Sequence, residues 1–355
     1  MKPADPKSKP TTYADAGVDI SAGERVVEMF RESVRSTFRP EVVGDIGGFG
    51  GAFAFDQSRY REPLLVFSTD GAGTKVIVAQ QAGIHDTVGI DLVAMSVNDV
   101  AAHGAEPLVF LDYIVIDKLV PGVVEEIVKG IAAGCRDAGC TLIGGEVAEH
   151  PGHLHPGSYD LAGFCTGVVE RSELLTGKSI TPGDVIIGMA SSGIHANGFS
   201  LVRKVLLHDM MLELDHRPIG FDHTLAEELL KPTFIYSGVM TALHREGLVK
   251  GFANITGGGL PGNLPRILPE DTRAEIESTS WEAPRIFELI ASLGQVSRAE
   301  MFSTFNMGIG MTAVVSPRDS NHVLDLIRSR GFQAFEIGSI KARDIDGDGV
   351  RVRIE

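Results

Sequence analysis

Residues 64–75 read Leu64-Leu65-Val66-Phe67-Ser68-Thr69-Asp70-Gly71-Ala72-Gly73-Thr74-Lys75, an apolar run followed at once by a polar, glycine-rich turn. The apolar part predicts a short buried strand over Leu64–Ser68, and the turn predicts the start of a helix. In α/β proteins ligands bind at such strand ends, where exposed backbone N–H groups attract phosphate. The spacing is not that of a Walker A loop, and taken by itself the stretch is better interpreted as a hydrophilic turn capped by Asp70.

Strand-like and helix-like patterns alternate on the C-terminal side of this stretch. A turn at Thr181-Pro182-Gly183-Asp184 interrupts the alternation, which then resumes. We therefore predict an α/β (α+β) protein with a disordered tail over residues 1–12 and two domains, residues 13–180 and 181–355. The expected strands are Pro107–Ile116, Thr141–Ile143, Tyr159–Val169, Val185–Ala190, Arg273–Glu277, Ile309–Val315 and Phe335–Ile340. The expected helices are residues 22–37, Val88–His103, one starting at Pro121, Phe199–His208, Ala226–Leu230, Thr233–Arg245, Arg285–Leu293 and Asn321–Arg330.

Composition limits the class of function. Of 355 residues, 43% are hydrophobic and 22% are charged, as in an ordinary globular protein. Because 47 acidic residues outnumber 32 basic ones, the net charge is −15, which argues against nucleic acid as a partner. The three cysteines form no Cys-x-x-Cys pair, and no run approaches the roughly 20 apolar residues of a membrane span. We expect a soluble, cytoplasmic protein with reduced thiols and no membrane contact.

Carboxylates follow two predicted strands and occupy one predicted helix of the first half. Asp91, Asn98 and Asp99 lie on a helix whose other positions are almost all apolar or small. Glu146 follows a strand in the run Gly144-Gly145-Glu146. Asp70, Asp99 and Glu146 would then face one edge of the sheet, where carboxylate oxygens suit Mg²⁺ bound to nucleotide phosphates. The alternative is a set of glycine turns with solvated acids.

The second half carries two further glycine-rich loops. Residues 191–198 read Ser191-Ser192-Gly193-Ile194-His195-Ala196-Asn197-Gly198, and residues 256–259 read Thr256-Gly257-Gly258-Gly259. Each loop precedes a predicted helix with a nearby cation, which suits a phosphate monoester. His195 alone is weak support for a catalytic base. A zinc site at His150, His153, His155 and Asp160 is less favoured than a solvated loop.

The motifs, taken in order from Tyr13 to Glu355, resemble the phosphoribosylformylglycinamidine cyclo-ligase (aminoimidazole ribonucleotide synthetase) family of purine biosynthesis. The stretches that carry the resemblance are Tyr13-Ala14-Asp15-Ala16-Gly17-Val18-Asp19-Ile20, Gly47-Gly48-Phe49-Gly50, residues 69–75, Gly89–Asp99, Gly104-Ala105-Glu106-Pro107, Gly144-Gly145-Glu146, Ser191–Arg203 and residues 256–259. No single tetrapeptide is diagnostic; the order and spacing are. The resemblance implies an N-terminal β-sheet domain that pairs with its copy in a barrel-like homodimer, with the active site between it and a C-terminal α/β domain.

The resemblance also implies the reaction: ATP-dependent closure of formylglycinamidine ribonucleotide to aminoimidazole ribonucleotide, with release of ADP and phosphate. Implied catalytic residues are Asp70, Lys75, Asp99 and Glu146, and implied Mg²⁺ ligands are Asp70, Asp99 and Glu146. Implied ATP-binding residues are Gly47, Gly48, Gly50, Gly51, Asp70, Thr74, Lys75, Asp91 and Asn98. Implied substrate-binding residues are Ser191, Ser192, Gly193, His195, Asn197, Thr256, Gly257, Gly258 and Gly259.

Three positions depart from the family pattern. Ala14 stands where Lys is common, Val147 where Thr is usual, and Asn254 where a His commonly precedes the glycine run. An amide cannot titrate in place of an imidazole. Selenophosphate synthetase, thiamine-monophosphate kinase, a hydrogenase-maturation carbamoyl dehydratase and formylglycinamidine ribonucleotide synthase are the related alternatives. A catalytically silent nucleotide-binding paralogue is a further one.

Overall fold

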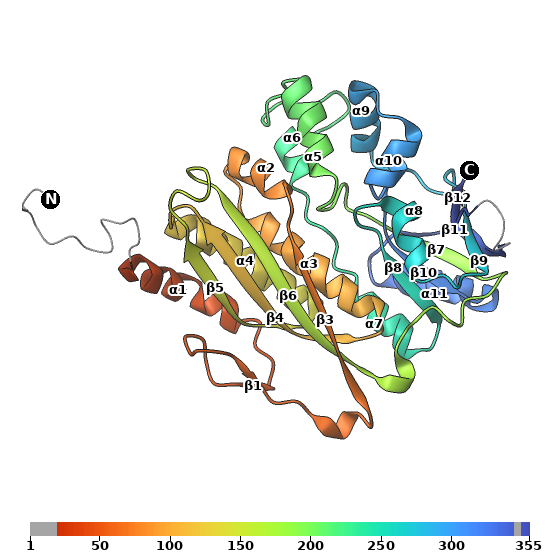
Figure 1. The fold of residues 1–355 in the computed structure, drawn as a ribbon, viewed down its shortest axis with the longest axis horizontal. Coiled ribbons are helices and arrows are strands. Elements are labelled where there is room, and N and C mark those ends of the chain that lie inside the picture. The colour runs from red at the N-terminus through yellow and green to blue at the C-terminus, as the bar shows by residue number, and fades with distance from the viewer. Residues whose placement is uncertain (1–19, 344–348) are drawn as a thin grey trace, which may run out of the picture.

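The computed structural model describes residues 20–343 and 349–355. The predicted tail and Ala14 lie outside these ranges. The first part of the chain forms a four-stranded sheet in the order β3-β6-β4-β5 (Figure 1). Its strands are β3 (Pro63–Gly71), β4 (Glu106–Ile116), β5 (Thr141–Glu149) and β6 (Tyr159–Glu170). β6 is antiparallel to both of its neighbours, and β4 and β5 are parallel.

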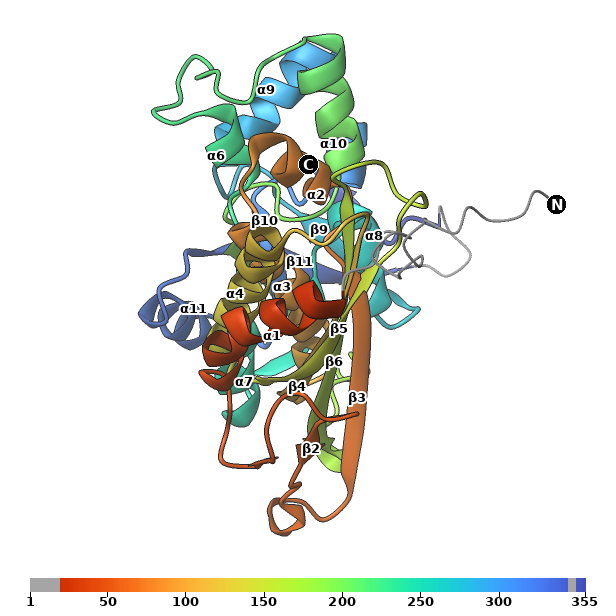
Figure 2. The ribbon, with the colours of Figure 1, turned by 90° about the vertical axis from the view of Figure 1, so that its left-hand side faces the viewer.

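Helices cover one face of this sheet and leave the other open. α3 (Asp86–Ala102) and α4 (Pro121–Ala138) pack side by side on it, and α1 (Ile20–Arg35) packs against α4 (Figure 2). Small residues bring α3 and α4 close: a Cβ on Gly89 would lie 2.4 Å from the carbonyl oxygen of Ile127. The opposite face exposes four large apolar side chains, Leu65, Phe67, Leu111 and Phe164.

Two strand predictions were wrong in extent. β3 is nine residues long and alternates between less and more buried positions, because it is an edge strand with one open face. β5 continues through Gly144-Gly145-Glu146, which were expected to form a turn after the strand. Glycine permits that extension because a Cβ on Gly145 would lie 2.1 Å from Oδ1 of Asp112 on the neighbouring strand.

The second part forms a six-stranded sheet in the order β12-β9-β11-β7-β10-β8. The strands are β7 (Val185–Ala190), β8 (Val249–Asn254), β9 (Thr272–Ile276), β10 (Ile309–Val315), β11 (Ala334–Ala342) and β12 (Val352–Ile354). β7 and β10 are apolar at nearly every position because the sheet is covered on both faces. β8 and β12 have short, mixed sequences and were missed.

The remaining elements surround the sheets and join them. They are β1 (Val42–Val43), β2 (Ala52–Phe53), η2 (Gln57–Arg59), α2 (Lys75–Ala82), η3 (Arg171–Glu173), α5 (Phe199–Val202), η4 (Arg203–Asp209), α6 (Leu225–Leu229), α7 (Ser237–Arg245), α8 (Gly259–Asn263), η5 (Leu264–Arg266), α9 (Arg285–Gly294), α10 (Arg298–Thr304), η6 (Pro317–Asp319) and α11 (Ser320–Ser329). The predicted helix Phe199–His208 is therefore a short α-helix continued by a π-helix, and α7 starts later than predicted. α3 contacts both α7 and β8, so the central helix of the first part packs on the second. Within the described ranges, every helix is too short or too polar to cross a bilayer.

Candidate active site

Asp70 and Asp99 form an acidic pair between the two parts of the chain. Asp70 lies near the end of β3 and Asp99 near the end of α3. Asn254, the last residue of β8, donates from Nδ2 to Oδ1 of Asp99 over 2.9 Å. Burial raises the pKa of both carboxyls, and the charge of Asp99 raises the pKa of Asp70 further. Two half-buried acids that interact electrostatically favour a shared cation or a shared proton.

Glu146 does not join this pair, which corrects the predicted three-carboxylate site. One row of paired residues crosses the sheet from Asp70 through Gly163 and Asp112 to Gly145. Glu146 is the next residue of β5 and therefore points to the opposite face. β3 and β5 are also opposite edges of the sheet, three interstrand steps or roughly 14 Å apart. Among the described residues, no cluster of three or more His, Cys, Asp or Glu could hold a metal ion.

Glu146 instead lines a cavity of about 1030 Å³ between α1, the glycine loop and β5. Gly47, Gly48, Gly50 and Gly51 all line this cavity. Gly47 has φ +102°, and a Cβ on Gly51 would lie 2.4 Å from the side chain of Ile143. The loop can follow this path over β5 only with glycine at these two positions.

Asp112 also lines the cavity, and sequence reasoning missed it. Asp112 is 8% exposed, and burial, with a smaller effect from Glu146, raises its pKa to about 7. The sequence feature that could have identified Asp112 is its place as a lone acid, at a core-facing position, in the apolar run Pro107–Ile116. A buried carboxyl that titrates near neutrality beside a cavity is a typical feature of functional sites.

Lys75 occupies a different place from the one predicted. Its ammonium is fully buried and lies 2.8 Å from Oδ2 of Asp91, which is also 0% exposed. The same Nζ donates to the carbonyl oxygens of His195 over 3.1 Å and of Lys231 over 2.6 Å. An ammonium has three N–H groups, and here each has an acceptor. In place of the predicted phosphate contact, Lys75 makes a buried link between the turn after β3 and the second part of the chain.

Asp91 and Asn98 face the same way on α3, as their spacing predicted, but both bind protein. Asp91 Oδ1 accepts hydrogen bonds from the backbone N–H and the hydroxyl of Thr233, over 2.8 and 2.6 Å. Asn98 accepts from the N–H of Tyr236 and donates to the carbonyl oxygen of Phe234. These two side chains therefore fix the segment that leads into α7, rather than facing a nucleotide.

The loop at Ser191–Gly198 is held in shape from within. The Ser191 hydroxyl contacts the side chain of Asn306, whose Nδ2 donates to the carbonyl oxygens of Gly193 and Ile194. The Ser192 hydroxyl donates to the carbonyl oxygen of Pro232 over 2.6 Å. Asn306 was missed because an isolated Asn carries no sequence signal.

His195 is buried within this loop and is neutral. It has φ +67°, and its Nε2 accepts from the backbone N–H of Ser192 over 3.2 Å. Burial, with a smaller effect of the Lys75 charge, lowers its pKa to about 3. The ring therefore orients the loop, and a role as the proton acceptor at neutral pH has no geometric support.

The loop at Thr256–Gly259 is shaped by Asn263. Asn263 Nδ2 donates to the carbonyl oxygens of Thr256, Gly257 and Gly259. Gly258 and Gly259 both have positive φ, and a Cβ on Gly259 would lie 1.9 Å from the carbonyl oxygen of Phe302. The backbone here adopts a course that is closed to residues with side chains.

Three of the predicted loops converge at the junction of the two parts. A Cβ on Gly73 would lie 3.5 Å from the carbonyl oxygen of Ala196, and one on Gly257 would lie 3.9 Å from Nδ2 of Asn197. Thr74 and Ser200 hydroxyls lie 3.2 Å apart. The turn after β3 and both loops of the second part thus meet near the acidic pair. The histidines at 150, 153 and 155 stand apart from this junction, and only His150 and His153 are in ring contact.

The fold and this junction define an α/β protein of two domains, and family comparison identifies the family. The N-terminal domain of AIR synthase related proteins matches residues 58–169, and their C-terminal domain matches residues 181–349. The chain belongs to the AIR synthase related family.

Curated relatives are similar over almost their whole length. A protein of Myxococcus xanthus named phosphoribosylformylglycinamidine cyclo-ligase is 55% identical over 94% of this chain and 96% of its own. A protein of the same name from Brevibacillus brevis is 51% identical, over 93% and 95%. Both alignments extend through the two domains.

Solved structures share the fold at lower identity. Thiamine-monophosphate kinase from Stenotrophomonas maltophilia has a TM-score of 0.66 at 18% identity, covering 92% of this chain and 96% of that one. Hydrogenase maturation protein HypE in complex with ATP has a TM-score of 0.65 at 18% identity, covering 96% and 93%. Thermotoga maritima PurL complexed with AMPPCP has a TM-score of 0.53 at 17% identity, covering 92% and 45%.

Proposed function

We infer that this chain is a phosphoribosylformylglycinamidine cyclo-ligase, which closes formylglycinamidine ribonucleotide to aminoimidazole ribonucleotide with conversion of ATP to ADP and phosphate. The observation that carries this inference is 55% identity to relatives of that name over 94% of the chain. The geometry agrees, because an acidic pair and three glycine-rich loops meet at one junction between the domains. We also propose 13–180 and 181–355 as the domain ranges.

The chemistry requires that a poor leaving group be activated. The formyl oxygen of the substrate attacks the γ-phosphorus of ATP, and ADP departs. The amidine nitrogen then attacks the formyl carbon, and the carbon–oxygen bond breaks with loss of inorganic phosphate and one proton. Phosphoryl transfer depends on positioning and neutralisation of charge rather than on covalent help from the protein. Loops that orient both reactants meet this need.

Within residues 20–343 and 349–355, we propose Asp70 and Asp99 as the residues that would hold a magnesium ion. Burial raises the pKa of both carboxyls, with a smaller effect of the Asp99 charge on Asp70, and a cation between them would favour their ionised forms. When bound, the ion would neutralise phosphate charge. Asn254 positions Asp99 through its hydrogen bond, a role that needs no titrating group. Glu146 belongs to the cavity under the glycine loop rather than to this site.

We propose that the triphosphate of ATP reaches the junction at Asp70 and Asp99 while the glycine loop covers the rest of the nucleotide, and that the loops at 191–198 and 256–259 take the ribose phosphate of the substrate. The support is the cavity of about 1030 Å³ that the loop and β5 enclose. Backbone N–H groups of glycine-rich loops bind phosphate without side chains. Asn263 and Asn306 hold the two substrate loops in shape.

We further propose a homodimer formed through the open face of the four-stranded sheet. Phe67 is 70% exposed there and Leu65 is 54% exposed. A row of large apolar side chains on one sheet face marks an interaction surface. The three cysteines are free and buried, which supports a cytoplasmic protein.

The test is phosphate release from ATP and Mg²⁺, with and without formylglycinamidine ribonucleotide, together with detection of the imidazole product. Substrate-dependent release in a one-to-one ratio with ring product supports the proposal. Phosphate or ADP formed without ring product would indicate a kinase or an uncoupled ATPase. ATP binding without any release would indicate a silent paralogue.

A further inference from the structure

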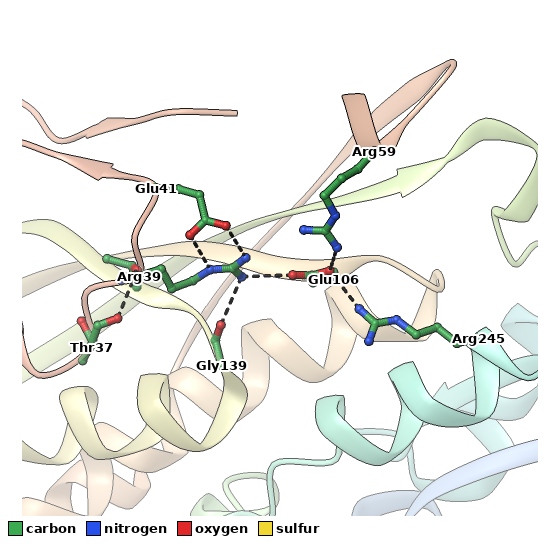
Figure 3. Close-up of polar contacts among 8 residues, drawn as sticks. Thr37, Arg39, Glu41, Arg59, Glu106, Gly139 and Arg245 are labelled. Carbon is green, nitrogen blue, oxygen red and sulfur yellow. Dashed lines mark hydrogen bonds and ion pairs between the residues drawn. The ribbon is translucent and has the colours of Figure 1, made fainter. Parts of the chain in front are cut away.

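Glu106 is the common partner of three arginines that come from separate parts of the chain (Figure 3). Its Oε1 accepts from Nη1 of Arg39 over 3.1 Å. Its Oε2 accepts from Nη2 of Arg59 over 3.0 Å and from Nη2 of Arg245 over 3.1 Å. Glu106 is the first residue of β4, an interior strand of the four-stranded sheet. The carboxylate thus presents two fixed acceptors at a rigid point.

Two of these arginines lie on the two stems of the glycine loop. β1 and β2 pair in antiparallel register, with Val42 opposite Phe53, and enclose residues 44–51 between them. Arg39 precedes β1, and Arg59 ends the short helix η2 that follows β2. The chain therefore comes from α1 past one arginine into the loop and passes another arginine before it enters β3, and both arginines bind the same carboxylate.

The third arginine brings the other domain to the same point. Arg245 is the last residue of α7, and α7 packs on α3. Because Oε2 accepts from both Arg59 and Arg245, the returning stem of the loop and the end of α7 share one acceptor atom. A shift of α7 would therefore alter the anchor of the loop.

The three arginines depend on Glu106 to different degrees. Arg39 also pairs with Glu41 over 3.0 Å and donates to the carbonyl oxygen of Gly139. For Arg59 and Arg245, Glu106 is the one ion-pair partner among residues 20–343 and 349–355. Loss of the Glu106 charge would thus remove the ion pairs of the returning stem and of the end of α7, while Glu41 and the carbonyl oxygen of Gly139 still hold the outgoing stem.

We propose that Glu106 is a positioning residue that fixes the glycine loop over its cavity and couples the loop to the C-terminal domain. The loop lines the cavity of about 1030 Å³, so its anchorage sets how readily that cavity opens. The consequence for nucleotide affinity rests on the proposed function; the anchorage itself does not. Half-exposed ion pairs are each worth about 0.2–1 kcal/mol, so two lost pairs correspond to a change of roughly five-fold.

The test compares Glu106→Gln with Glu275→Gln as a matched control. Glu275 pairs with Arg273 over 2.8 Å at similar exposure, within the C-terminal sheet. Chymotrypsin cleavage after Phe49, a fully exposed residue of the glycine loop, measures loop opening in full-length protein without any nucleotide. We expect Glu106→Gln to be cleaved there roughly five-fold faster than the unchanged protein, and Glu275→Gln at an unchanged rate.

Kinetics supply the second readout. We expect KM for ATP to rise by a similar factor in Glu106→Gln while kcat changes less than about two-fold, because the loop binds rather than reacts. Arg245→Gln should accelerate cleavage after Phe49 as well, since it removes the ion pair between the end of α7 and Glu106 and leaves the pairs of Arg39 and Arg59 with Glu106 in place. Unchanged cleavage in Glu106→Gln overturns the proposal, as does a fall in kcat at unchanged KM. If the unchanged protein lacks ATP turnover, the proposed function fails while the cleavage rates still decide the role of Glu106.

Discussion

Replacing Lys75 by Met removes the ammonium that pairs with Asp91, the most deeply buried ion pair within residues 20–343 and 349–355. Asp91 then stays in a fully buried position with only the two hydrogen bonds from Thr233. Removing one partner of a buried ion pair costs roughly 3–5 kcal/mol. We therefore expect the free energy of unfolding of Lys75→Met, measured by urea denaturation, to fall by about that amount.

A double variant separates the loss of the pair from the loss of a ligand contact. Lys75→Met with Asp91→Leu removes both charges, so it should recover most of the stability, short of about 1–3 kcal/mol for the unpaired donors of Thr233. Lys250→Met is the control, because its pair with Asp184 lies within the C-terminal domain, and Asp184 keeps its hydrogen bond from the Thr181 N–H. If Lys75→Met keeps its full stability but KM for ATP rises strongly, then Lys75 binds nucleotide phosphate and the assigned link is wrong.

Three further predictions concern single positions. Between about pH 4 and pH 7 the folded protein keeps a proton on Asp112 that the unfolded chain has lost, so the free energy of unfolding falls as pH rises through this window. Asp112→Asn should therefore be more stable than the unchanged protein at pH 8, by about 4 kcal/mol at most. Equal stability at pH 8 would contradict the burial of the Asp112 carboxyl. His195→Asn tolerates the positive φ and should lower activity without changing the shape of the pH profile of kcat/KM, whereas loss of a titration step would identify His195 as the base. Phe67→Asp should convert the proposed dimer to monomer in sedimentation equilibrium, and an unchanged mass would exclude this sheet face as the interface.

The sequence was sufficient for the class of fold and for most of the elements. Apolar runs such as Val185–Ala190 and Ile309–Val315 have strong strand patterns because both faces of their sheet are covered. β8 and β12 escaped prediction because Val249–Asn254 and Val352–Ile354 are short and mixed in polarity. β5 was cut short at Gly144, since glycine usually ends a strand, whereas here Gly145 gives room to Asp112.

The site was harder to predict because residue type does not specify strand order or sheet face. Glu146 was grouped with Asp70 on the basis of similar places after strands, but the order β3-β6-β4-β5 puts them at opposite edges. Lys75 looked like a phosphate ligand because it follows a glycine-rich turn. Its actual partners, Asp91 and two carbonyl oxygens, come from distant parts of the chain, and the sequence does not reveal that they lie beside it. The glycine loops were identifiable because their backbone conformations require glycine itself.

In the proposed reaction, ring closure proceeds through phosphorylation of the formyl oxygen. The most direct test is a single turnover with substrate carrying a heavy-oxygen isotope in the formyl group, in the presence of ATP and Mg²⁺, followed by mass analysis of the released phosphate. We predict that each imidazole product is matched by one phosphate that contains the labelled oxygen. Labelled oxygen released into water, with phosphate that takes its new oxygen from solvent, would contradict the account.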